Sequence, residues 1–120
     1  MSAKRPLPET FDLQALAHRG EGVFLTHGAR IIDADEGCAV ISGYTREELL
    51  ALPSVLELVA PRECPRIADR LKRRLAGEML EAQYKSWIVR KDGCEVPVEV
   101  AVRLANPEES RILVFVRDLS

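Results

Sequence analysis

The feature that most constrains the fold is an unbroken alternation near the C-terminus. Apolar residues occupy every second position from Val96 to Leu104, and charged residues such as Glu99 and Arg103 lie between them. Since successive side chains of a strand point to opposite faces, this pattern predicts an antiparallel strand with one buried face. The Asp-Gly pair at 92–93 is typical of a hairpin turn, so residues 80–90 are expected to form the partner strand.

Three further strands are expected outside this hairpin. Residues 112–116 are five consecutive apolar residues, the pattern of a strand that is covered on both faces. Residues 23–25 and 31–32 are short apolar runs on either side of a turn that contains Gly28. This arrangement predicts a second hairpin, near the N-terminus.

Short helices are expected between the two groups of strands. Asp35 can cap a helix over residues 36–42, and Thr45 with Glu48 three positions later has the pattern of a capping box that begins a second helix. Helices that cluster between the strands of an antiparallel sheet are typical of an α+β domain. We therefore predict an α+β fold, with short helices on one face of a five-stranded antiparallel sheet.

A longer helix is expected to begin near Pro65 and to end at Gly77. Ile67 and Leu71 mark its apolar side. Its basic residues are Arg66, Arg70, Lys72, Arg73 and Arg74. These could contact phosphates or an acidic partner, but neighbouring acidic residues dilute their charge, and a solvated face is the interpretation we favour.

Composition excludes several classes of protein. The 120 residues are 47% apolar and 30% charged with a net charge of −2, which indicates one globular domain and excludes a globally basic nucleic-acid binder. No apolar run approaches the ~20 residues that span a bilayer. The N-terminus lacks the apolar stretch of a signal peptide, so we expect a cytoplasmic protein.

Residues that could carry chemistry are few. The three cysteines, Cys38, Cys64 and Cys94, and the two histidines, His18 and His27, lack the spacing of a disulfide framework or a metal site. No Ser, Cys or Thr can be paired with a base from its spacing, so we expect neither a catalytic residue nor a bound metal. A small apolar role is favoured for the cysteines, while a redox role stays open.

Four segments resemble motifs of PAS domains in their order and spacing. Gly43–Leu50 is similar to Gly-Tyr-Ser-x-Glu-Glu-Leu, and Arg90–Gly93 is similar to the Arg-Lys-Asp-Gly hairpin of that family. Ile31–Asp35 resembles the Ile-x-x-x-Asn strand, with Asp in place of Asn, and Arg117–Ser120 resembles the Asp-Ile-Thr motif that ends the PAS core. The resemblance covers about residues 21–120.

The resemblance implies a PAS domain over residues 21–120. The preceding extension, residues 1–20, is expected from its own pattern to carry a short amphipathic helix on the other face of the sheet, because apolar residues recur at helical spacing between Thr10, a possible N-cap, and Gly20, a possible stop. The resemblance implies a sensory module of a bacterial signal-transduction or transcription-regulatory protein, which binds a small apolar ligand in its core, dimerises, or does both. The module would regulate a linked C-terminal output domain, such as a helix-turn-helix transcription factor, a histidine kinase or a diguanylate cyclase. A ligand-free module for dimerisation or protein interaction is the alternative.

The resemblance also bears on cofactors and partners. Flavin-binding members carry an Asn-Cys-Arg-Phe-Leu helix, and haem-binding members carry a histidine in or just after the longer helix. Residues 61–80 hold no histidine and no segment matches the flavin motif, so we expect no haem and no FMN. The domain itself is expected not to be an enzyme. Its expected partners are a small molecule, a second copy of the chain and the linked output domain, and neither a nucleic acid nor a membrane.

The candidate ligand pocket is an apolar interior between the sheet and the helices. The residues expected to line it are Ile41, Tyr44, Leu56, Leu58, Ile67, Leu71, Tyr84, Val98, Val100 and Val114. The signal is expected to leave through Arg117 and Asp118, because these residues follow directly on the last strand.

A candidate dimer interface lies on the outer face of the sheet. Leu113 and Phe115 are expected to form an apolar patch there, with Trp87 beside them. The N-terminal helix is expected to cover this patch, in the same protomer or across a two-fold axis. It would do so through Phe11, Leu13 and Leu16.

Overall fold

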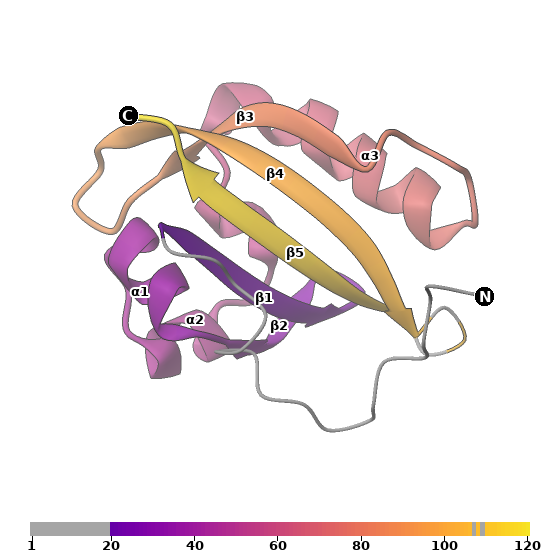
Figure 1. Cartoon of the computed structure of the whole chain (residues 1–120), viewed down its shortest axis with the longest axis horizontal. Coiled ribbons are helices and arrows are strands. Elements are labelled where there is room, and N and C mark those ends of the chain that lie inside the picture. Colours follow the sequence, from indigo (N-terminus) through magenta and orange to yellow (C-terminus); the bar gives the residue numbers. More distant parts are fainter. Residues whose placement is uncertain (1–19, 107, 109) are drawn as a thin grey trace.

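A computed structural model describes residues 20–106, 108 and 110–120 (Figure 1). Five strands form one antiparallel sheet in the order β2-β1-β5-β4-β3. They are β1 (Glu21–His27), β2 (Arg30–Ala34), β3 (Gln83–Val89), β4 (Glu95–Asn106) and β5 (Arg111–Asp118). β5 therefore lies at the centre and joins the two predicted hairpins, although it is the last of these strands in the chain.

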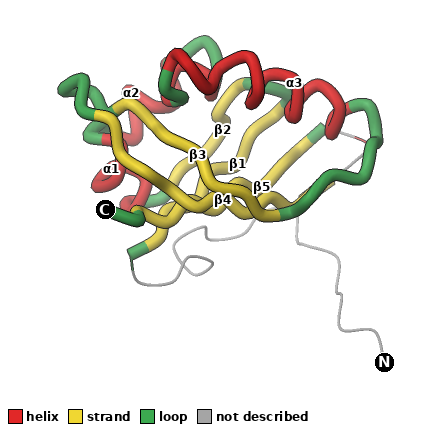
Figure 2. Tube along the Cα trace, turned by 90° about the horizontal axis from the view of Figure 1, so that it is seen from above, coloured by secondary structure: helices red, strands yellow, loops and turns green. Residues whose placement is uncertain are grey.

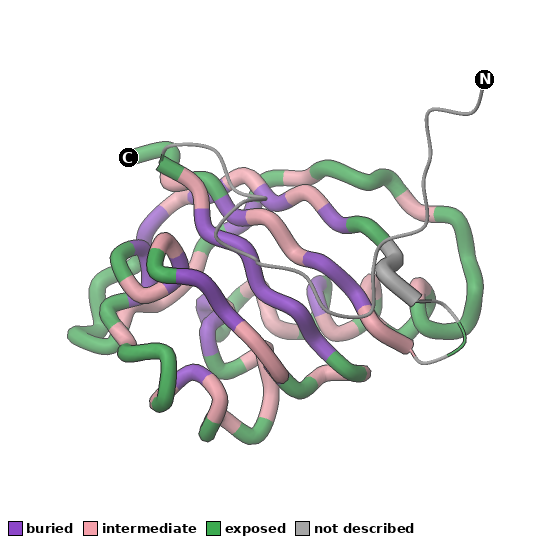
Figure 3. Tube along the Cα trace, turned by 60° about the horizontal axis from the view of Figure 1, so that its bottom comes forward, coloured by how far each residue is buried: buried purple, intermediate pink, exposed green. Residues whose placement is uncertain are grey.

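The alternating segment forms β4, as its pattern predicts. The valines at alternate positions from Val96 to Val102 are all buried in the core. Antiparallel pairing places Val100 opposite Tyr84 of β3 and opposite Val116 of β5, so one row of side chains crosses three strands. Figure 3 shows burial concentrated along the central strands.

The described helices follow β2 and lie on one face of the sheet (Figure 2). They are α1 (Glu36–Ser42), α2 (Arg46–Ala51) and α3 (Cys64–Leu75), with the short 3-10 helices η2 (Val55–Leu58) and η3 (Pro61–Glu63) between them. Asp35 caps α1 by accepting a hydrogen bond from Cys38 N (3.0 Å), and Gly43 ends this helix with a φ of 79°. Thr45 and Glu48 form the predicted capping box of α2.

One segment differs from the expectation. The partner strand of the C-terminal hairpin, expected over residues 80–90, is shorter, because its pairing with β4 begins with Gln83 opposite Ala101. Residues 54–59 contain η2, where Ser54 Oγ accepts a hydrogen bond from Leu56 N (3.1 Å).

The outer face of the sheet is apolar at its centre. Val23, Leu25 and Leu113 alternate with the inward-facing residues of β1 and β5, and all three are buried. Phe115, opposite Val23, is partly buried. The described helices lie on the other face, so these side chains form a second, smaller apolar layer.

Trp87 lies away from this layer, so its predicted place beside Leu113 is wrong. The register pairs Trp87 with Pro97, whereas Leu113 pairs with Arg103. Six positions of β4 separate these two pairs, which corresponds to about 20 Å along the strand. The Arg62 guanidinium stacks over the Trp87 ring instead, at 5.1 Å from its centroid.

The predicted N-terminal helix and its candidate interface residues, Phe11, Leu13 and Leu16, lie outside the described residues. Both this helix and the dimer therefore stay predictions. None of the helices in the described ranges is long and apolar enough to cross a membrane.

Candidate functional site

An apolar cavity of about 100 Å³ lies between the inner face of the sheet and the helices. Cavities of this order admit small organic molecules, since an engineered apolar cavity of about 150 Å³ binds benzene. Seven elements and Val59 contribute side chains to its wall, which are Phe24, Thr26, Cys38, Ile41, Ser42, Val55, Leu58, Val59, Ile67, Arg70, Leu71, Arg74, Tyr84, Ile88, Val100, Val102, Ile112, Val114 and Val116. Most of these side chains are apolar, so the cavity suits an apolar guest.

Seven of the ten candidate pocket residues lie in this wall: Ile41, Leu58, Ile67, Leu71, Tyr84, Val100 and Val114. Three do not. Leu56 is not among the lining residues, whereas Val55 and Leu58, which are one turn of the 3-10 helix apart, both line the cavity. Val98 is fully buried in the core without lining the cavity, and Tyr44 packs against that core from the turn after α1. That the seven bind a ligand stays a prediction.

Two arginines of α3 belong to the wall, although the sequence favoured a solvated face for them. Arg70 and Arg74 line the cavity together with Ile67 and Leu71. Positions 67, 70, 71 and 74 are spaced i, i+3, i+4 and i+7, which is one side of a helix. The spacing alone would place the two arginines on the apolar side of the helix, whereas their charge favours a solvated face.

The two cavity arginines converge on one backbone oxygen. Arg70 Nη2 and Arg74 Nη2 both donate to the carbonyl oxygen of Glu81, at 2.9 and 2.8 Å. The Arg70 guanidinium also stacks over the Tyr84 ring, with its Cζ atom 4.1 Å from the ring centroid. The loop before β3 and the ring on β3 thus hold both guanidinium groups beside the cavity.

Burial shapes the protonation of this cluster. Burial raises the pKa of Tyr84, and the neighbouring Arg70 and Arg74 guanidinium groups oppose this rise only in part. Burial lowers the pKa of Arg74, and the like charge of Arg70 lowers it further. At neutral pH the phenol is therefore protonated and can donate a hydrogen bond.

Cys38 lines the cavity, but its thiol is not activated. Burial, followed by the nearby charge of Asp35, raises the pKa of the Cys38 thiol. Cys64 Sγ lies 3.7 Å from the carbonyl oxygen of Leu56, and Cys94 is exposed. Within the described ranges, no three His, Cys, Asp or Glu side chains gather in a group that could hold a metal.

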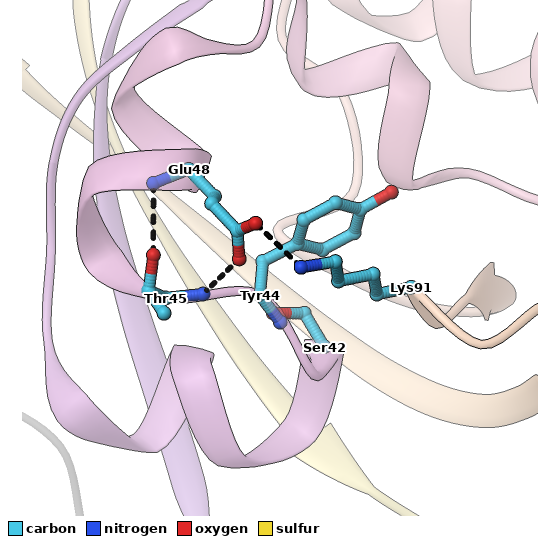
Figure 4. A network of polar contacts seen from close by, with 5 residues as sticks. All are labelled: Ser42, Tyr44, Thr45, Glu48 and Lys91. Carbon is cyan, nitrogen blue, oxygen red and sulfur yellow. Dashed lines mark hydrogen bonds and ion pairs between the residues drawn. The ribbon is translucent and has the colours of Figure 1, made fainter.

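The two segments that most resemble PAS motifs contact each other (Figure 4). Lys91 N donates to the carbonyl oxygen of Ser42 (2.9 Å), and Lys91 Nζ pairs with the carboxylate of Glu48. Thr45 N donates in turn to Glu48 Oε1 (2.9 Å), and Tyr44 N donates to Ser42 Oγ (3.2 Å). This network joins α1 and α2 to the β3–β4 turn, so these motif residues have a structural role.

The expected signal exit lies at the end of β5. Arg117 pairs with Glu99 on the neighbouring strand β4. Asp118 Oδ1 accepts hydrogen bonds from Ser120 N (2.8 Å) and Ser120 Oγ (2.6 Å). Leu119 N donates to the carbonyl oxygen of Pro97 (2.9 Å), so the sheet holds the chain up to its last residues.

Comparisons with known proteins agree with this geometry. No protein-family model matches the chain, and no curated protein matches it. A domain of a sensory box sensor histidine kinase/response regulator from Geobacter sulfurreducens is 28% identical, with a TM-score of 0.71 over 88% of this chain and 90% of that chain.

Two further similar structures were solved as complexes with small molecules. The PAS domain of a LuxR-family transcriptional regulator from Burkholderia thailandensis, in complex with ethanol, is 21% identical, with a TM-score of 0.68 over 91% of this chain and 98% of that chain. The PAS domain of the RpfR quorum-sensing receptor from Cronobacter turicensis, in complex with C12:0, is 10% identical, with a TM-score of 0.71 over 88% of this chain and 99% of that chain. At these identities the likeness shows the fold alone. From the four motifs, the strand order and the match to the Geobacter domain, we conclude that this chain is a PAS domain.

Proposed function

We propose that this PAS domain is a signal-sensing module whose cavity binds a small, mainly apolar molecule and thereby regulates a linked output domain. The observation that carries the proposal is the apolar cavity itself, which α3 closes over the inner face of the sheet. The ethanol and C12:0 complexes of proteins with the same fold support it. We assign no haem, no FMN and no catalytic step to the domain.

The path from cavity to exit is short. Ile112, Val114 and Val116 of β5 all line the cavity, and Arg117 and Asp118 follow directly on this strand. A ligand shifts the equilibrium between two states of the module only if its affinity for them differs. In this proposal, the ligand selects the arrangement of β5 that packs against it, and the residues after β5 transmit that arrangement.

A ligand-free dimerisation or protein-interaction module is the second candidate. The apolar centre of the outer sheet face, formed by Val23, Leu25 and Leu113, favours it, because the cores of protein interfaces are apolar. The two functions are compatible, since the cavity and this layer lie on opposite faces of the sheet.

The test compares the chain with a variant whose cavity is filled. Val114→Phe adds a ring inside the cavity, whereas Val40→Phe adds the same ring on α1, where Val40 is 73% exposed. We expect native mass spectrometry and thermal-shift screens to detect small-molecule binding by the wild-type chain and the Val40 variant, but not by the filled variant. The same samples should be free of visible absorption bands.

Two results would count against the proposal. One is a wild-type chain that carries no ligand and binds none in the screen. The other is equal binding by the wild-type chain and a folded Val114→Phe variant, because binding would then lie outside the cavity.

A further inference from the structure

Arg70 and Arg74 differ from neighbouring arginines in their charged partners. Among the described residues, neither has a carboxylate within ion-pair distance, whereas Arg62 and Arg66 each pair with one and Arg73 pairs with two. Both cavity arginines donate to the carbonyl oxygen of Glu81, which carries no net charge. Two positive charges therefore face an apolar cavity without an anion to balance them.

Arg70 also has an unused donor. Its Nε atom is buried and has no hydrogen-bond partner in the described structure. A buried donor without an acceptor is unfavourable and rare in folded proteins, so the arrangement calls for an acceptor that enters from outside the chain. The Tyr84 hydroxyl belongs to the same cluster and adds a further potential donor.

We propose that the cavity takes a monocarboxylate with a short or medium hydrocarbon chain, whose carboxylate binds Arg70 and Arg74 while the chain occupies the apolar wall. This inference rests on the proposed function and specifies its ligand class. A carboxylate presents two oxygens to the planar, forked donors of guanidinium groups, which makes it their preferred small anion.

The shape of the site favours one charge and a short chain. The polar residues of the cluster lie on α3 and β3, and the rest of the wall is almost wholly apolar. A second charge on the ligand would be buried against that apolar wall without a partner. The volume of about 100 Å³ limits how much of the hydrocarbon chain the cavity can enclose.

The experiment titrates the full chain with octanoate, 1-octanol and octylamine in a calorimeter at neutral pH. These three probes share one hydrocarbon chain and differ in the charge of the head. We expect octanoate to bind about tenfold more tightly than 1-octanol, and octylamine to bind more weakly than both. The Nε–Hε signal of Arg70 in a ¹H–¹⁵N spectrum should shift on addition of octanoate and not of 1-octanol.

Variants separate the contribution of the ligand's head group from that of its hydrocarbon chain. Arg70→Gln and Arg74→Gln should each weaken octanoate binding about tenfold and weaken 1-octanol binding much less. Arg73→Gln is the matched control, because Arg73 lies on the same helix and pairs with Asp69 and Glu78 instead of lining the cavity. Arg70→Lys keeps the positive charge but removes the forked donors of the guanidinium group. It replaces Arg70→Gln in the experiment if that variant does not fold.

The outcomes distinguish this inference from the proposed function. If 1-octanol binds as tightly as octanoate, or if folded Arg70 and Arg74 variants bind octanoate like the wild type, the carboxylate inference is wrong and the cavity keeps its sensing role. If no probe binds, and broad screens of the wild-type chain also find no ligand, both proposals fail.

Discussion

Asp35 fixes the junction between β2 and α1 with a single oxygen atom. Its Oδ1 accepts hydrogen bonds from Val23 N and from Cys38 N, both at 3.0 Å, and the residue is 4% exposed. Asp35→Ala would leave both amide groups without this acceptor, so we expect a loss of about 1–3 kcal/mol in the free energy of unfolding. Urea denaturation of the full chain measures it.

The conservative variant supplies the control. Asp35→Asn keeps an oxygen in the same place and should lose clearly less stability than Asp35→Ala. Equal losses in the two variants would show that the acceptor oxygen is not what stabilises this junction.

The close approach at Gly37 points to the same tight packing, since a Cβ atom built there would lie 2.0 Å from the carbonyl oxygen of Glu21.

At the scale of elements, the sequence was most informative where periodicity and capping residues agree. The alternation of β4, the Asp-Gly turn, the capping box of α2 and the helix from Pro65 follow from local rules. The cavity followed less completely. Arg70 and Arg74 face inward because both donate to the carbonyl oxygen of Glu81 and Arg70 stacks on the Tyr84 ring. Both partners lie outside α3, so the pattern of the helix alone does not predict these contacts.

The exit element carries a prediction of its own. The Asp118 carboxylate accepts hydrogen bonds from Ser120, two residues away, so Asp118→Ala should leave the melting temperature of the domain within a few degrees of the wild type. In a protein that links this domain to an output domain, as proposed, the same change should uncouple output from the ligand. An output assay with and without ligand, together with thermal melts, measures both effects.

Asp92→Ala is the matched control for Asp118→Ala. Asp92 makes a similar local hydrogen bond, from Cys94 N to Oδ1 (2.9 Å), in the turn between β3 and β4, away from the exit. It should leave ligand-dependent output intact. Unfolding of the Asp118 variant, or equal effects of the two changes on output, would assign Asp118 a structural role.

At the scale of the whole molecule, the outer sheet face decides the state of association. We predict that the N-terminal helix covers Leu113 and Phe115, together with their neighbours Val23 and Leu25, within one protomer or across a two-fold axis. Deleting residues 1–20 should expose this layer and cause aggregation or a different oligomeric state, which light scattering detects. Replacing Phe11, Leu13 and Leu16 together by Ser in the full chain should have the same effect.

Well-behaved monomers from both the intact and the shortened chain would overturn that prediction.

The sequence could identify the apolar residues of the outer face, but it could not place Trp87, because the register between β3, β4 and β5 sets its distance from Leu113. Strand register depends on contacts between distant segments, which local patterns do not contain.

The central place of β5 has a consequence for how the protein is made. Until this strand emerges, the chain holds two separate hairpins, each with an unpaired edge that invites aggregation. The pairing of Glu21 with Arg117 closes a loop over nearly the whole described chain, and contacts so distant in sequence form slowly. Because the same strand lines the cavity, a ligand there would stabilise only the completed sheet. Supply of the ligand would then set how long each copy survives in the cell, as well as what it signals.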